Sequence, residues 1–486
     1  MKRFDIIIVG GGAVGCAIAY TLGRYDARIA LLERELDVAM GTSGKNSAVV
    51  HAGFNNKPGS LMAKLCVEGN KRFEAVCKTL DVPYKKSGKL IVGFNEEDMA
   101  VIDALLEDGR KNGAIGLKKI GREEMKALEP NIEGIGAMLS SDTAVFDPFL
   151  YCIHLCEAAM QNGVSFFMGN EVLGIRKERE SFVITTCKDE YQCKILINAA
   201  GLYADMVSAM AGDDRFRQYP CRGEYYILDE KVSKLLSRPV YPAPRKGVGG
   251  LGVHFTTAID GSVLIGPSAE YIEDREDYAT TQTVMDQLLR EARLLLPALK
   301  KDMIIGSYSG IRPKLVRKGE GNFGDFVIEE SPKAERLIHL IGIESPGLTA
   351  SMPIAEMAVG IALKNTPLKE KKGKGVYRAE YRGAAVFAPL SPEKQDRLIE
   401  KDANYGEVVC RCRTITKAET LEALRNPLGV KSVVGVKNRV HAMMGRCQGG
   451  YCLPKIAEIM MEECGVPPEG ITYRSDGDAL FSGRLK

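Results

Sequence analysis

The sequence predicts an α/β (α+β) protein that opens with a β–α–β unit, continues with further sheet strands and helices, and ends in a small C-terminal module. Three observations predict it: a glycine-rich turn between a strand and a helix near the start, alternating strands in the middle, and four cysteines near the end. The 486 residues are enough for two or three packed units. With 45% hydrophobic and 27% charged residues, the chain is typical of globular proteins, so disordered and fibrous classes are excluded.

The charge is nearly balanced, with 66 Lys and Arg against 63 Asp and Glu. We therefore expect no nucleic-acid partner. Because no apolar run of roughly 18 residues occurs and the first residues read as a strand, we expect neither a membrane span nor a secretory leader. The 13 cysteines then indicate a reducing, cytoplasmic setting, in which clustered cysteines are metal ligands or redox groups rather than disulfides.

Hydrophobic patterns place the elements along the chain. A β–α–β unit opens it, with strands at 4–9 and 28–33 around a helix at 13–23. Further helices are expected at 60–80, 97–113, 147–162 and 281–299, and from about 350. Further strands are expected at 164–168, 182–187, 193–198, 222–228, 251–256, 262–266 and 337–343.

The first turn fits the fingerprint G-x-G-x-x-G of a dinucleotide site. Gly10 permits the turn, Gly12 lets a pyrophosphate approach the backbone, and Gly15 allows the helix to pack closely on the strand. Glu33 ends the second strand, where its carboxylate can accept both ribose hydroxyls. The candidate nucleotide-binding residues here are Gly10, Gly12, Ala13, Gly15, Glu33 and Arg34.

Two later segments favour FAD over NAD, which shares the fingerprint. Residues 198–201 and 342–349 each follow a predicted strand and contain glycine, so both can return to the same nucleotide. The second precedes a helix, whose N–H groups would stabilise the reduced flavin at its N1/C2 edge. The additional candidate residues are Ala200, Gly201, Gly347, Leu348 and Thr349.

Several short segments resemble those of the D-amino-acid-oxidase-like flavoprotein superfamily. Within it, the chain is similar to the FAD-dependent glycerol-3-phosphate dehydrogenase/oxidase branch and its neighbour, L-2-hydroxyglutarate dehydrogenase. The segments that carry the resemblance are 42–53, 57–60, 63–66, 222–225, 252–256, 266–267 and 310–313. The resemblance covers about residues 3–365 and separates the two branches poorly.

The resemblance implies a Rossmann-like FAD-binding domain interleaved with an antiparallel-sheet substrate domain within residues 1–365. A charged connector is expected at 366–406 and a metal-binding module at 407–486, because so short a segment cannot bury a large core alone and a bound metal would help it to fold. The FAD-binding parts would be about 1–80, 145–215 and 335–365, and the substrate domain about 81–144 and 216–334.

The same resemblance implies oxidation of a secondary alcohol by hydride transfer to flavin N5, which requires a base for the hydroxyl proton. His51 and His254 are both candidates, and we prefer His51 as the base and His254 as a substrate partner. Arg312 would bind the anionic group of the substrate, with Lys314 as a second cation. Residues expected along the flavin are Thr42, Ser43 and Ser47.

The cysteines of the module form the pattern C-x-C-x34-C-x4-C. Four thiolates suit a [2Fe–2S] cluster or, as a minor alternative, zinc. The spacing and the glycines around the second pair resemble the bacterioferritin-associated-ferredoxin-like [2Fe–2S] domain. The expected ligands are Cys410, Cys412, Cys447 and Cys452.

Together these features predict a dehydrogenase whose FAD passes electrons through the cluster to a partner flavoprotein or quinone-linked subunit, in a hetero-oligomer. The preferred substrate is sn-glycerol 3-phosphate. The alternatives are L-2-hydroxyglutarate or another 2-hydroxy acid, an amino-acid dehydrogenase subunit, and a non-enzymatic electron-transfer subunit. We expect a cytoplasmic protein that its partner can hold at the inner face of the membrane.

Overall fold

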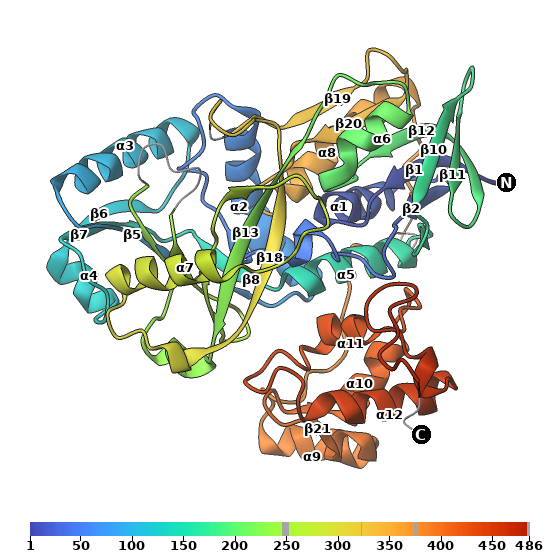
Figure 1. Cartoon of the computed structure of the whole chain (residues 1–486). Coiled ribbons are helices and arrows are strands. Elements are labelled where there is room, and N and C mark those ends of the chain that lie inside the picture. The colour runs from blue at the N-terminus through green and yellow to red at the C-terminus, as the bar shows by residue number, and fades with distance from the viewer. Residues whose placement is uncertain (245–251, 322, 374–376, 484–486) are drawn as a thin grey trace.

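The computed structural model describes residues 1–244, 252–321, 323–373 and 377–483 (Figure 1). Its first sheet has eight strands, in the order β10-β11-β12-β1-β2-β9, with β20 beside β12 and β19 beside β20. The neighbours of β1 and β2 run parallel to them, as the β–α–β unit requires. The strands are β1 (Lys2–Val9), β2 (Ile29–Leu32), β9 (Ser165–Phe167), β10 (Val172–Lys177), β11 (Phe182–Thr186), β12 (Glu190–Asn198), β19 (Val327–Glu330) and β20 (Leu337–Ile341).

Helices cover both faces of this sheet (Figure 1). One face carries the largest apolar core, because nearly every residue of the first helix is buried between the sheet and its neighbours. The opposite face packs against a short helix through Val207 and Ala211. The helices of the large core are α1 (Ala13–Leu22), α2 (Leu61–Thr79), α5 (Pro148–Gln161) and α8 (Ser351–Asn365), and the short helix is α6 (Ala204–Met210).

The second sheet has nine strands, in the order β17-β13-β16-β15-β14-β5-β7-β6, with β18 paired to β13. Its two longest strands, β13 and β18, run antiparallel over ten matched positions. The strands are β5 (Lys89–Gly93), β6 (Leu117–Gly121), β7 (Gly136–Ser140), β13 (Tyr219–Leu228), β14 (Val240–Pro242), β15 (His254–Thr257), β16 (Val263–Gly266), β17 (Glu270–Tyr271) and β18 (Ile304–Lys314). The helices packed on it are α3 (Glu96–Asn112), α4 (Arg122–Leu128) and α7 (Gln282–Leu295).

A three-stranded sheet lies beside the first helices. Its strands are β3 (Val49–Val50), β4 (Tyr84–Lys85) and β8 (Ala144–Phe146), with β8 in the middle. It ties the segment after residue 48 to the start of α5, whose N-cap Asp147 follows β8 directly.

The C-terminal module has its own apolar core and lies against α5 (Figure 1). Buried ion pairs hold it there: Arg439 contacts Asp37 after β2, and His441 contacts Asp147 at 2.8 Å. The elements of the module are α9 (Pro392–Lys401), β21 (Val408–Cys410), β22 (Ile415–Thr416), α10 (Lys417–Leu424), α11 (Val433–Val440) and α12 (Cys452–Cys464).

The structure differs from the sequence reading in several places. Strands β5, β6 and β7 were not expected, and the helix expected at 281–299 ends at Leu295. The expected connector contains α9, and Phe387 within it packs against Tyr405 of the module. Residue 251 of one expected strand and residues 374–376 of the connector lie outside the described residues. Among the helices that the structure describes, none combines the length and apolarity needed to cross a bilayer.

Candidate active site and cysteine centre

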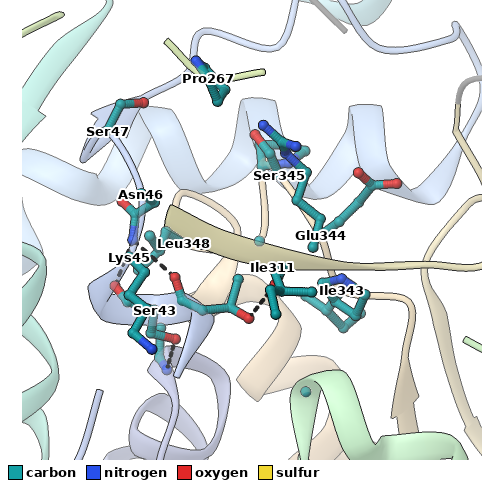
Figure 2. Close-up of a pocket in the computed structure, with 18 of the residues that line it drawn as sticks. Ser43, Lys45, Asn46, Ser47, Pro267, Ile311, Ile343, Glu344, Ser345 and Leu348 are labelled. Atoms are coloured by element: carbon teal, nitrogen blue, oxygen red, sulfur yellow. Dashed lines mark hydrogen bonds between the residues drawn. The ribbon is translucent and has the colours of Figure 1, made fainter. Parts of the chain in front are cut away.

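A cavity of about 220 Å³ lies between the two large sheets (Figure 2). Three segments meet there: the glycine-rich turn before α1, the strap at residues 42–51, and the turn at residues 343–349. Strands β15 and β18 of the second sheet close the other side. The predicted residues that line the cavity are Gly12, Ala13, Thr42, Ser43, Ser47, His51, Gly201, His254, Arg312, Gly347, Leu348 and Thr349.

The glycines of the first turn have separate structural roles. A Cβ on Gly10, whose φ is +107°, would lie 2.5 Å from the Ala199 carbonyl oxygen, and a Cβ on Gly15 would lie 1.9 Å from the Gly10 carbonyl oxygen. Both positions therefore exclude a side chain for packing reasons. A Cβ on Gly12 would meet only Ser43 Oγ, at 3.1 Å, so it would occupy the cavity itself.

The polar groups of the strap fit a bound dinucleotide. Ser43 Oγ accepts a hydrogen bond from Ala13 N at 2.9 Å, which holds the strap over the N-terminus of α1. Thr42 Oγ1 donates to the Ile311 carbonyl at 2.7 Å and joins the strap to β18 (Figure 2). Lys45 Nζ is buried with no hydrogen-bond partner among the described residues, so a diphosphate in this cavity would supply its missing acceptor.

Five predicted nucleotide-binding residues lie outside the cavity lining: Gly10 and Gly15 of the first turn, and Glu33, Arg34 and Ala200. Glu33 accepts hydrogen bonds from Gly11 N at 2.5 Å and Glu35 N at 2.9 Å, which places its carboxylate at the end of β2 beside the glycine turn. Arg34 lies over the Tyr203 ring, 4.2 Å from its centre, and pairs with Glu276 at 2.8 Å. Ala200 packs against Gly10, 3.0 Å from its ideal Cβ position.

His254 presents a free nitrogen in the cavity wall. Its Nδ1 lies 2.8 Å from the Gly252 carbonyl oxygen, so Nδ1 carries the proton and Nε2 keeps its lone pair. Nε2 is buried and has no hydrogen-bond partner in the described chain. Burial lowers the pKa of His254 to about 3, so the ring is neutral at neutral pH.

His51 lies on the strap. Its backbone N donates to Thr349 Oγ1 at 3.0 Å, and its Nε2 lies 3.4 Å from Ser345 Oγ. Burial, and then the charges of Lys89 and His254, hold the pKa of His51 well below its usual value. Both predicted histidines are thus neutral imidazoles in one cavity, each able to accept a proton or a hydrogen bond.

Arg312 supplies a positive charge to the same cavity. Both of its terminal nitrogens donate to the Ser268 carbonyl at 3.2 Å, and no carboxylate pairs with it in the part of the chain that the structure describes. Lys314 differs, because it forms a buried ion pair with Glu344 at 3.0 Å. The expected second cation is therefore already neutralised within the protein.

Sequence reasoning missed two residues behind the histidines. Tyr241 of β14 lines the cavity and stacks on the His254 ring, with 3.6 Å between ring centres. Lys89 of β5 lies behind Tyr241 and is 1% exposed. The one sequence feature that could have identified Lys89 is its place at the start of the apolar run Lys89–Gly93. A lysine at that place is equally typical of an exposed strand end.

The four predicted cysteines come together in the module as two pairs. The sulfur atoms of Cys412 and Cys447 are 3.6 Å apart. A hydrogen bond from the Cys452 thiol lowers the pKa of Cys410 to about 6, which marks the second pair. No group of three or more potential ligands among the described residues is arranged around one metal ion, whereas two pairs suit a cluster with two irons.

Backbone donors surround these thiols, as an anionic cluster requires. N–H groups of Met443 and Arg413 donate to Cys410, and those of Tyr451 and Gly449 donate to Cys447. Cys410 and Cys452 are buried, whereas Cys447 is exposed. The centre therefore has one buried side and one side open to solvent.

Comparison with known proteins identifies two regions of the chain. Residues 5–360 match the family described as FAD dependent oxidoreductase, and residues 408–462 match the BFD-like [2Fe-2S] binding domain. The second match supports an iron–sulfur centre and gives no support to zinc. The predicted resemblance and fold class are confirmed.

Individual relatives resemble most of the chain. A glycerol 3-phosphate dehydrogenase of Caloramator mitchellensis is 36% identical over 99% of both chains. An L-2-hydroxyglutarate dehydrogenase of Indibacter alkaliphilus is 31% identical over 74% of this chain and 99% of its own. Among solved structures, the FAD-bound L-alpha-glycerophosphate oxidase of Mycoplasma pneumoniae has a TM-score of 0.74 and 30% identity, over 79% of this chain and all of its own.

The glycine turn, the strap and the cavity therefore belong to a flavoenzyme, and the paired cysteines belong to a module of iron–sulfur type. The chain is a member of the FAD dependent oxidoreductase family that carries a C-terminal BFD-like [2Fe-2S] binding domain.

Proposed function

We propose that the protein is a dehydrogenase that oxidises sn-glycerol 3-phosphate to dihydroxyacetone phosphate. The main support is the 36% identity with a glycerol 3-phosphate dehydrogenase along 99% of both chains, a match that includes the cysteine module. The cavity supports it, since two neutral histidines and an unpaired guanidinium face one space. These are the groups that an anionic secondary alcohol needs.

Each side chain has a role that follows from its contacts. Bound FAD would accept the hydride from the alcohol carbon. His51 takes the hydroxyl proton, and the neighbouring Ser345 hydroxyl, 3.4 Å from its Nε2, orients the ring. His254 accepts a hydrogen bond at Nε2 and so fixes the hydroxyl. Arg312 holds the phosphate, which its two terminal nitrogens can bind in bidentate fashion.

We assign FAD binding to the glycine turn, the strap and the turn before α8, with Glu33 at the ribose. We assign the cluster to Cys410, Cys412, Cys447 and Cys452. The exposed sulfur of Cys447 supports electron transfer to a partner protein, because it gives the centre an open side. An oxidase that delivers electrons to O2 would need no such module, so we infer a flavoprotein or quinone-linked partner.

One observation favours a second substrate. Lys314 is neutralised by Glu344, and Lys45 is assigned to the diphosphate, which leaves Arg312 as the cation for the substrate in the described cavity wall. One guanidinium matches a single carboxylate as well as a phosphate. L-2-Hydroxyglutarate is therefore the alternative, in keeping with the L-2-hydroxyglutarate dehydrogenase among the relatives.

Anaerobic mixing of the oxidised protein with each substrate tests these proposals. We expect sn-glycerol 3-phosphate to bleach the flavin absorbance, with L-2-hydroxyglutarate much slower. The reverse order would move the assignment to the hydroxy acid. If neither substrate nor any amino acid bleaches the flavin, the enzymatic proposals fail, and the interpretation as a non-enzymatic electron-transfer subunit remains.

A further inference from the structure

Lys89 is a buried amine without a counter-ion. Its side chain lies in β5 of the second sheet and is 1% exposed. No carboxylate pairs with it in the described ranges, and its Nζ lies over two aromatic rings, 4.7 Å from the centre of Phe54 and 4.4 Å from that of Tyr241. Burying an unpaired ammonium is costly, so its retention here calls for a function.

Its surroundings connect it to the cavity. The Tyr241 ring that Lys89 contacts also stacks on the His254 ring, and the planes of the two rings differ by only 13°. His254 Nε2 lies in the cavity wall beyond that stack. The titratable groups that respond to the charge of Lys89 are His51, His254 and the thiol of Cys66, and Arg312 acts on His254 as well.

We propose that Lys89 is a positioning residue for the reaction, a cation behind the cavity wall that holds Tyr241 against His254 and adds its positive charge to the surroundings of both cavity histidines. The proposal rests on the function inferred above. It assigns Lys89 no contact with the substrate, because Lys89 does not line the cavity.

The sign of the effect follows from the charges. Burial lowers the pKa of Lys89 to about 7, so its amine is charged below neutral pH and largely uncharged above. Below neutral pH its charge opposes protonation of both imidazoles, which is the range in which an ordinary histidine would become protonated. Lys89 therefore extends the acid side of the working range and has little electrostatic effect on the alkaline side.

The test compares the holoenzyme with Lys89→Met and Lys89→Arg. Methionine keeps the length of the side chain and removes its charge. FAD content and melting temperature check that the Lys89→Met protein is folded. We expect both to stay unchanged, because the substitution leaves no buried charge unpaired. With sn-glycerol 3-phosphate, we expect the acid limb of the pH profile of flavin bleaching to shift to higher pH in Lys89→Met, with little change at about pH 8.5. Lys89→Arg should keep the parental profile.

A second measurement does not depend on turnover. The chain has five histidines, so [15N]histidine NMR of the oxidised holoprotein can follow each ring, with His51→Gln and His254→Gln for assignment. We expect Lys89→Met to raise the pH at which these two rings protonate. An unchanged histidine titration, or a loss of bleaching equal at all pH values, would overturn the proposal. If the parent is not bleached by any substrate, the proposed function fails, and NMR still decides the role of Lys89.

Discussion

Arg439 of α11 and Asp37 after β2 form a two-pronged ion pair between the cysteine module and the FAD-binding region, with N···O distances of 2.5 and 3.2 Å. The side chains are 6% and 0% exposed. Arg439→Met leaves the Asp37 carboxylate buried without its partner, which costs about 3–5 kcal/mol. We expect a lower melting temperature and protease cleavage between the two regions, with flavin bleaching by substrate retained.

The double variant Asp37→Leu with Arg439→Met is the matched control. It removes both charges, so much of the lost stability should return. Arg425→Met, which breaks the exposed pair with Glu463, should change the melting temperature little. Equal losses in the single and double variants would contradict the assignment.

The His441–Asp147 pair makes this interface pH-dependent. Burial opposes the charge on His441, but the Asp147 carboxylate outweighs it and raises the pKa of His441 above its usual value. A raised pKa stabilises the fold fully below about pH 6.5, and this contribution disappears as pH rises through the folded pKa. As pH rises above neutrality, the urea concentration at the unfolding midpoint should therefore decrease more for the parent than for His441→Gln. Parallel midpoints across the range would show that the pair contributes nothing.

The sequence predicts the parts of the site that depend on backbone geometry. Gly10 and Gly15 leave no room for a Cβ, so their spacing between a predicted strand and a predicted helix identifies the turn. The cysteine pairs were likewise predictable, because thiols at this spacing have few other uses. The strands β6 and β7 were missed, since LKKIG has one buried residue and GAMLS contains poor strand formers.

Pairings between distant segments could not be predicted. Lys314 reads as an available cation until Glu344, 30 residues away, neutralises it. Asp37 and Arg439 are 402 residues apart. Lys89 is covered by Tyr241 of β14 and by Phe54, which follows the strap, and no local pattern reveals such packing.

Gly12 tests the FAD cavity. The Cβ of Gly12→Ala would enter the space assigned to the pyrophosphate, so we expect loss of bound FAD from a protein whose apo form melts normally. Gly15→Ala should fail to fold, because its Cβ meets the Gly10 carbonyl. Gly121→Ala, where nothing lies within 4 Å of the added atom, should retain FAD. Full FAD occupancy in Gly12→Ala would contradict the placement.

Arg312 tests the anion site. Charge-assisted hydrogen bonds contribute about 1.5–3 kcal/mol each, so Arg312→Met should raise the substrate concentration needed for half-maximal bleaching at least about tenfold. FAD reduction by dithionite should be unaffected. Arg317→Met, an exposed residue outside the cavity lining, serves as the control. An unchanged concentration dependence would place the substrate anion elsewhere.

Cys412 separates the two halves of the proposed reaction. Its sulfur lies 3.6 Å from that of Cys447, so Cys412→Ser removes one of the four proposed ligands, while the cavity, which Cys412 does not line, stays intact. We expect normal flavin bleaching by substrate, altered or absent iron–sulfur absorption, and loss of turnover with the physiological acceptor. Cys464→Ser, at the far end of α12, should keep all three properties. Undiminished acceptor turnover by Cys412→Ser would mean that electrons leave the flavin without passing through the module.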